Sequence, residues 1–259
     1  MIDQWLDLPD WAMFLVLAAG YTCTGAFAVG LSFLPVFRPM AVRCQGVVAP
    51  FFVSAGALFG LMTAFLGSAV YDTVRQANQT VMQEREAAIQ IIDLARVRED
   101  IPAIARLPDL TRAYLNTVLE HEWHPSDKRF SAPEAERAYS ALLDTIADPE
   151  VGRAGGNAIQ AAFLRAAQEI SSARVVRLTL RSPRADHFRW AGVLLLGVVT
   201  QFSIAVVHLD RIRPQLLALF LSTCAAVVAL GVIAVTERPF DGALAVSAEP
   251  LRQVVESRW

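Results

Sequence analysis

The chain has 259 residues, of which 54% are hydrophobic, and its formal net charge at pH 7 is −2. A mean hydropathy of +0.40 is too high for an ordinary soluble domain, so the composition predicts a membrane protein. The small net charge gives no sign of a nucleic-acid partner, and we expect none.

Four stretches carry no Asp, Glu, Lys or Arg, and each is long enough to cross a bilayer as a helix. They cover residues 11–37, 44–71, 190–207 and 214–236. Four spans place both termini and the long segment between the second and third spans on one side of the membrane. The distribution of arginine over the two sides does not decide which side is cytoplasmic.

The segment 72–189 contains 33 of the 48 charged residues and is therefore the water-exposed part. Its apolar residues recur every three or four positions from Val74 to Ala95, with no helix breaker after the second span. This spacing predicts one continuous helix from about Val47 to about Arg96. Three more helices are expected: one at about 109–122 with Asp109 as N-cap, one from Ser131 to before Asp148, and one at about 157–181.

The predicted fold is all-α, an integral membrane protein with four transmembrane helices and a helical soluble insert between the second and third. Residues 1–71 hold the first two spans, 72–189 the helical domain, 190–236 the last two spans and 237–259 a tail. Pro239 cannot continue a helix without losing a backbone hydrogen bond. We therefore predict that the last span ends near Thr236 and that the chain turns, with Gly242 at positive φ.

No pattern typical of an enzyme, a cofactor site or a metal site is visible. His121 and His124 are three residues apart and Pro125 follows at once, whereas a zinc protease helix has two histidines four apart. A glycine-rich phosphate loop is also missing from the sequence. We expect no catalytic residue, no cofactor and no metal.

Three arginines, Arg174, Arg177 and Arg181, share one helical face just before the third span. Two interpretations are open. The arginines either contact lipid phosphates or the glutamates of a neighbouring helix, or they line a vestibule that concentrates anions at a pore mouth. Glu84 interrupts an otherwise apolar stripe. Because burying an isolated carboxylate is costly, we predict that Glu84 is paired, with Arg174 and Arg177 as the expected partners; the alternative is that Glu84 faces water.

Small residues recur every four positions along the second span, at Gly56, Gly60, Ala64 and Ser68. Such a stripe permits close helix contact, either inside the four-helix unit or at a subunit interface around a pore. Phe52 and Phe59 lie seven apart and are candidate pore constrictions, although both positions also suit contact with lipid. The spans contain no charged residue, which disfavours an ion-coupled transporter but not a passive channel.

Three groups of residues carry a resemblance to a known family. The first is the apolar stretch 56–65, followed by Tyr71 and by Gln-Glu-Arg-Glu-Ala-Ala at 83–88. The second is Tyr114, followed by Glu122 and Trp123. The third combines Arg174, Arg177, Trp190 and the run Arg238-Pro239-Phe240-Asp241-Gly242. With these motifs, residues 50–255 resemble the bestrophin-like bacterial family of four-helix membrane proteins.

This resemblance implies cytoplasmic termini and insert, a location in the inner membrane, and self-association as a pentamer around a central anion pore. It marks Trp123, Pro239, Phe240 and Gly242 as structural residues, while the scattered acidic residues of the tail do not support calcium gating. We therefore expect a homo-oligomeric, anion-permeable channel that contacts membrane lipid and passes inorganic ions. A cation channel of the same architecture is one alternative. A non-conducting scaffold or sensor whose helical domain binds a partner is another.

Overall fold

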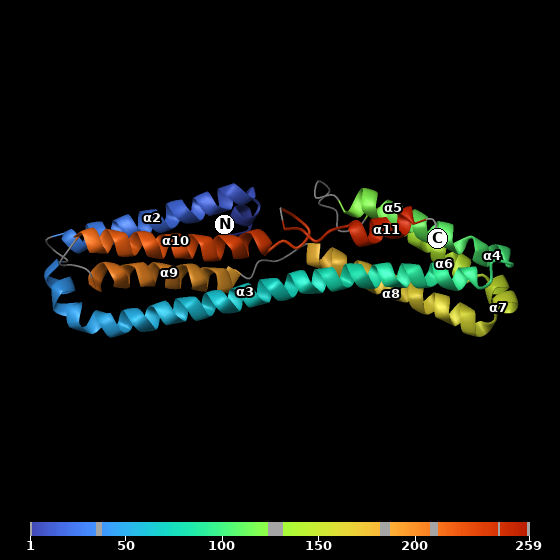
Figure 1. The fold of residues 1–259 in the computed structure, drawn as a ribbon, viewed down its shortest axis with the longest axis horizontal. Helices are drawn as coiled ribbons and strands as arrows, with labels where there is room; N and C mark the ends of the chain where they lie inside the picture. Colours follow the sequence, from blue (N-terminus) through green and yellow to red (C-terminus); the bar gives the residue numbers. More distant parts are fainter. Residues whose placement is uncertain are drawn as a thin grey trace. The chain divides into compact units, whose positions relative to one another are not determined.

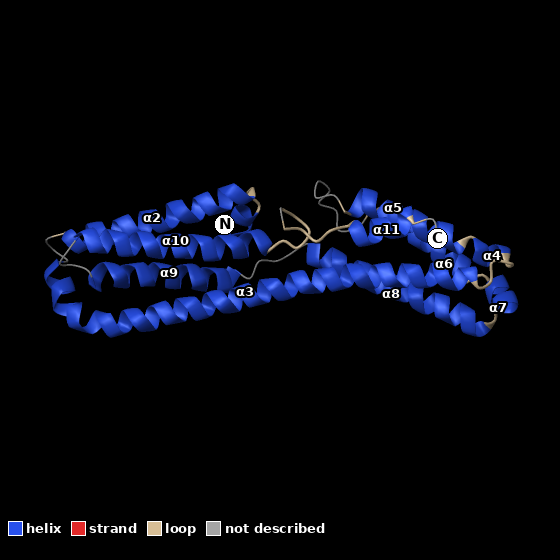
Figure 2. Ribbon diagram, viewed as in Figure 1, coloured by secondary structure: helices blue, strands red, loops and turns tan. Residues whose placement is uncertain are grey.

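The computed structural model describes residues 2–34, 38–123, 132–181, 187–207, 212–242 and 244–257. Within these ranges every regular element is a helix, and Figure 2 shows no strand among them. The chain divides into two compact units. The membrane unit comprises Met1–Asp72, Arg184–Arg238 and Gly242–Leu244, and the helical unit comprises Thr73–Pro183, Pro239–Asp241 and Ala245–Trp259. The predicted all-α fold is confirmed.

In the described residues, the membrane unit is built from five helices. They are α1 (Ile2–Leu6), α2 (Asp10–Phe33), the first part of α3 (Arg38–Arg96), α9 (His187–Val207) and α10 (Ile212–Thr236). In the described part of the chain, α2, α3, α9 and α10 are long and apolar enough to cross a membrane, and they correspond to the four predicted spans. α2 packs along both α10 and α9, which follow it by more than 150 residues in the sequence (Figure 1).

Two glycines let α2 approach its neighbours closely. The ring of Phe14 lies over Gly231 of α10, and the ring of Tyr21 lies over Gly197 of α9. A Cβ atom at either glycine would overlap the ring. Small residues favour such contacts in a bilayer, because packing and hydrogen bonds, rather than the hydrophobic effect, hold transmembrane helices together.

A polar cluster joins the same three helices. The Gln201 side chain of α9 donates from Nε2 to the carbonyl oxygen of Tyr21 (3.0 Å) and to Oγ1 of Thr223 on α10 (2.9 Å). Its Oε1 accepts a hydrogen bond from the Thr24 hydroxyl of α2 (2.5 Å). Hydrogen bonds of this kind between spans replace the contacts that water would supply elsewhere.

In the described residues, the helical unit contains the rest of α3 and several shorter helices around one apolar core. They are α4 (Pro102–Ala105), α5 (Leu107–Thr117), the π-helix η1 (Val118–Glu122), α6 (Pro133–Ile146), α7 (Pro149–Gly155) and α8 (Asn157–Arg181). The short α11 (Glu249–Glu256) packs on α5. The core takes one or more large apolar side chains from most of these elements, among them Ile91, Leu115, Leu142, Phe163 and Leu251.

Helix α3 runs without a break from Arg38 to Arg96, so the predicted continuity is confirmed, although the helix begins nine residues before the expected Val47. No glycine or proline occurs between Tyr71 and Arg96, so nothing in this stretch favours a kink. Helix α8 has the predicted bounds, and α10 ends at Thr236, before Pro239. Gly242 has a φ of +84°, which confirms the turn expected there.

One predicted N-cap is wrong. Asp109 does not cap α5, which begins at Leu107; Pro108 fits its first turn because an N–H there needs no helical partner. α6 begins at Pro133, close to the expected start near Ser131. Ser131 itself lies outside the described residues, so the capping box stays a prediction.

Candidate functional site

Glu84 of α3 is fully buried in the helical unit and is paired as predicted. Its Oε2 lies 2.8 Å from Nε of Arg177 on α8. The Tyr114 hydroxyl of α5 donates to its other oxygen, Oε1, at 2.8 Å. The prediction is confirmed for Arg177, whereas the ion pairs of Arg174 are with other glutamates.

Glu122, the last residue of η1, connects the two arginines. Its Oε2 lies 3.0 Å from Nη2 of Arg177, and its Oε1 lies 2.7 Å from Nη2 of Arg174. Arg174 also binds Oε2 of Glu136 on α6 through Nη1, at 2.6 Å. Five charged side chains from α3, η1, α6 and α8 therefore form one continuous ion-pair network. Glu136 reaches the surface, while the other four are buried.

The network compensates the cost of burying its charges with many hydrogen bonds. Burial by itself raises the pKa of Glu122, but the hydrogen bond from Arg174 and the charges of Arg177 and Arg174 outweigh it and lower the pKa below its usual value. Ala132 strengthens this effect because its N–H donates to Oε1 of Glu122 (3.1 Å). Burial, followed by the neighbouring Glu84 carboxylate, holds the pKa of Tyr114 well above 10. Tyr114 therefore stays a neutral donor.

Trp123 and Phe240 extend the network with aromatic contacts. The guanidinium carbon of Arg177 lies 5.5 Å from the centre of the Trp123 ring, within the range of a cation–π interaction. Phe240 meets the same ring edge to face, with 5.7 Å between ring centres. Phe240 belongs to the turn after the last span, where the N–H of Val246 donates to the carbonyl oxygen of Pro239 (2.7 Å). Trp123 thus joins this turn to the ion pairs.

The positions of the three arginines favour the ion-pair interpretation over the vestibule. Arg174 and Arg177 are 6% and 2% exposed, and glutamates surround both guanidinium groups, so neither presents a free charge to water in this subunit. Arg181 is half-buried and donates to the carbonyl oxygen of Glu122. Helical spacing places the three arginines on one face but does not show whether that face is exposed or buried. The positions of the facing glutamates decide this.

Phe52 and Phe59 are half-buried within the membrane unit. Phe52 packs against a cluster containing Ile204 and Leu219, and Phe59 against one containing Met13. The structure therefore uses both rings, at least in part, to hold the subunit together.

The small-residue stripe of α3 has the opposite character. Gly60, Ala64 and Ser68 are exposed, and a Cβ atom added at Gly56 or Gly60 would meet no atom within 4 Å. Packing inside the four-helix unit, one of the two interpretations of this stripe, is therefore not what the subunit shows. The stripe is an open surface of α3.

Sequence reasoning missed Glu122 and Glu136 as partners of the arginines, and Tyr114 as a partner of Glu84. Glu122 and Tyr114 were noted only within a family motif, and Glu136 lies on an ordinary amphipathic helix. Glu122 stands next to Trp123 at the end of a helix with an apolar face. This pattern is the one sequence feature that could have indicated a buried, paired carboxylate at Glu122. His121, next to it, is exposed, and His124 lies outside the described residues.

The sequence profile of the Bestrophin-like domain matches residues 11–251. The chain belongs to the Bestrophin-like family. A crystal structure of a variant of a bacterial bestrophin homologue from Klebsiella pneumoniae aligns with a TM-score of 0.65 and 14% identity, over 93% of this chain and 96% of that one. A second structure of a bestrophin homologue from this organism has the same TM-score and identity, over 93% and 95%.

A crystal structure described as a membrane protein variant aligns with a TM-score of 0.67 and 14% identity, over 94% of this chain and 96% of that one. At these identities the solved structures show a shared fold. A comparison with curated proteins finds no match. The bestrophin-like assignment made from the sequence motifs is confirmed.

Proposed function

We propose that this bestrophin-like chain is the subunit of a homo-oligomeric, anion-permeable channel, and that α3 forms the contact between subunits. The observation that carries this proposal is the open small-residue stripe of α3, at Gly60, Ala64 and Ser68. In a bilayer such a stripe is a surface on which another helix packs closely. Since the subunit leaves it uncovered, a second copy of the chain is the simplest occupant.

The adjoining face of α3 supplies side chains for the pore wall. Leu61 and Phe65 are 51% and 61% exposed, and they follow one another at helical spacing beside the stripe. We place the hydrophobic constriction at these two residues instead of Phe52 and Phe59, whose rings pack partly inside the subunit. Rings of apolar side chains gate channels by excluding water.

Family membership supports the choice of ion and the cellular setting. Bestrophin resemblance implies anion selectivity, a pentamer, a location in the inner membrane and a helical unit on its cytoplasmic side. The absence of charged residues within the spans fits a passive pore and gives no proton relay or coupling-ion site.

The test is the mass of the purified oligomer together with ion flux from proteoliposomes. We expect an oligomer that releases chloride faster than potassium, and Gly60→Leu should give monomers without flux. Gly60→Ala keeps the position small and is the matched control, which should assemble and conduct. Potassium release without chloride release would identify a cation channel instead. A monomeric parent protein without flux would favour the scaffold.

A further inference from the structure

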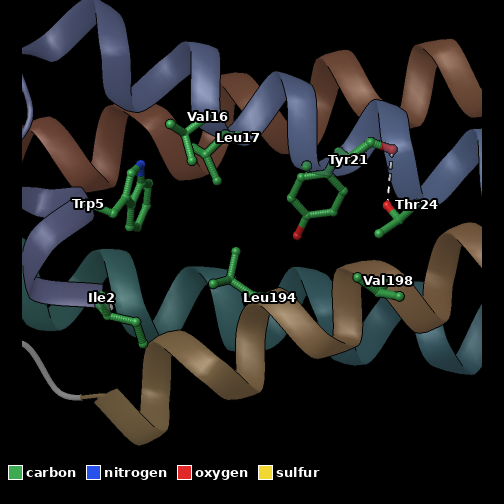
Figure 3. Close-up of a pocket in the computed structure, with 9 residues that line it drawn as sticks. Ile2, Trp5, Val16, Leu17, Tyr21, Thr24, Leu194 and Val198 are labelled. Atoms are coloured by element: carbon green, nitrogen blue, oxygen red, sulfur yellow. Dashed lines mark hydrogen bonds between the residues drawn. The ribbon is translucent and has the colours of Figure 1, made fainter.

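A pocket of about 290 Å³ lies in the membrane unit between α1, α2 and α9, and its lining is almost entirely apolar. Nine residues form it: Ile2, Trp5, Val16, Leu17, Gly20, Tyr21, Thr24, Leu194 and Val198 (Figure 3). None of them is charged. For comparison, an engineered cavity of roughly 150 Å³ in another protein holds one benzene molecule. The pocket therefore has room for a single hydrocarbon chain or one small ring system.

One polar group in this lining has no partner. The side chain of Tyr21 is 4% exposed, and its hydroxyl, which points from α2 toward α9, makes no hydrogen bond with the described part of the chain (Figure 3). The other polar side-chain groups of the lining are occupied, because the Trp5 N–H donates to the carbonyl oxygen of Met13 (3.3 Å) and the Thr24 hydroxyl donates to Gln201. A buried hydroxyl without an acceptor is costly, so Tyr21 points to a ligand that supplies one.

The depth of the pocket indicates where such a ligand comes from. Tyr21 is eleven residues into α2, which is roughly 16 Å of helix and close to the middle of a hydrocarbon layer about 30 Å thick. Val16 and Gly20 of the lining are exposed on the outside of the subunit. Molecules that reach this opening are dissolved in the bilayer, where water is scarce.

We propose that the pocket binds a neutral, single-chain amphiphile whose oxygen accepts a hydrogen bond from Tyr21. Its hydrocarbon chain would lie along Leu17 and Leu194, toward Trp5. The ligand is neutral because the lining offers no cationic side chain to pair with a carboxylate or phosphate, and an unpaired charge at this depth is expensive. This site is independent of ion conduction.

The first experiment compares two probes on the purified full-length chain in nanodiscs, 11-bromo-1-undecanol and 1-bromoundecane. Bromine quenches tryptophan fluorescence, and Trp5 borders the pocket. We expect saturable quenching, with the alcohol binding roughly five-fold more tightly than the bromoalkane, as one neutral hydrogen bond implies. In Tyr21→Phe this ratio should fall to about one while the bromoalkane binds as before. That variant loses no hydrogen bond in the free subunit, so we expect it to fold normally.

The second experiment blocks the pocket. Gly20 and Gly30 both lie on α2, both are exposed, and a Cβ atom at either would meet nothing within 4 Å, but only Gly20 lines the pocket. Gly20→Leu should abolish saturable quenching and Gly30→Leu should preserve it. Leu194→Phe fills the pocket from α9 and is the second blocking variant. Quenching that never saturates, or equal binding by the Gly20 and Gly30 variants, would overturn the site. Equal affinity for both probes in the parent would overturn the role of Tyr21.

Discussion

Glu122 carries more of the helical unit's internal connections than its position at a helix end suggests. One carboxylate binds two arginines of α8 and the backbone N–H of Ala132, and Trp123 beside it contacts Arg177 and Phe240. Since both guanidinium groups are buried, removing the shared carboxylate leaves each with a single partner, Glu84 for Arg177 and Glu136 for Arg174, and takes away several charge-assisted hydrogen bonds.

Replacing Glu122 with Gln should therefore lower the free energy of unfolding by roughly 2 kcal/mol, the size of a buried hydrogen bond to a charged group. The measurement is a denaturant titration of the purified protein followed by circular dichroism. Glu134→Gln is the control, because the Glu134–Arg137 pair is exposed and such pairs contribute only about 0–1 kcal/mol. Equal losses in the two variants would show that the network does not stabilise the unit.

The lowered pKa of Glu122 also predicts an acid-sensitive stability. A carboxyl group whose pKa is depressed by folding stabilises the protein fully above its unfolded value, about 4.5. This contribution is lost as the pH falls through the lower, folded-state pKa. The free energy of unfolding measured from pH 6 to pH 3 should thus fall less steeply in Glu122→Gln than in the parent. Parallel curves would contradict the assignment.

Some of this chemistry could be predicted from the sequence and some could not. The partner of Glu84 could be predicted from the sequence because a carboxylate on an apolar stripe needs a cation. Arg177 lies on the helix that precedes the third span and was therefore a candidate. The place of Glu122 was not, because it depends on η1, and a single π-turn has no distinct sequence pattern. Whether Arg174 faces water or a glutamate depends on tertiary packing, which helical spacing does not encode.

Among the elements, α3 has two exposed faces in the membrane unit, and the proposed channel uses both. Its small face at Gly60 and Ala64 offers close approach to another helix, and its large face at Leu61 and Phe65 offers apolar bulk. Periodicity predicted the continuity of this helix and its end at Arg96, since nothing between Tyr71 and Arg96 breaks it, but not its start at Arg38. It could not predict which face the subunit leaves uncovered, because that depends on where α2, α9 and α10 pack.

If Leu61 and Phe65 form the constriction, Leu61→Ala and Phe65→Ala should each raise chloride flux several-fold by widening an apolar barrier. Phe52→Ala should leave flux per assembled channel unchanged and lower stability by roughly 2 kcal/mol, about half the cost at a fully buried site. The readouts are proteoliposome flux and thermal unfolding of the same preparations. If only Phe52→Ala raised the chloride flux, Phe52 and not Leu61 or Phe65 would belong to the constriction.

For the whole molecule, the proposed orientation places the helical unit in the cytoplasm. Asp144 is exposed on α6, so a cysteine at this position can react with a reagent in water. The reporter is Asp144→Cys in a chain whose native cysteines, Cys23, Cys44 and Cys224, are replaced. A membrane-impermeant maleimide should label it in inside-out vesicles and leave it unlabelled in intact spheroplasts. The reverse pattern would invert the assignment.

The packing of α2 also determines when the membrane unit can complete its folding during synthesis. α2 needs α9 and α10 to complete its contacts through Gly197, Gln201 and Gly231, yet about 200 residues separate the end of α2 from the end of α10. At a synthesis rate of roughly 5–20 residues per second, the first span waits in the bilayer for about 10–40 s before its last partner arrives. Until α9 is inserted, Thr24 and Tyr21 lack their partners Gln201 and Gly197, and Phe14 lacks Gly231 until α10 follows. The newly inserted chain is thus most exposed to quality-control proteases before its final span is made.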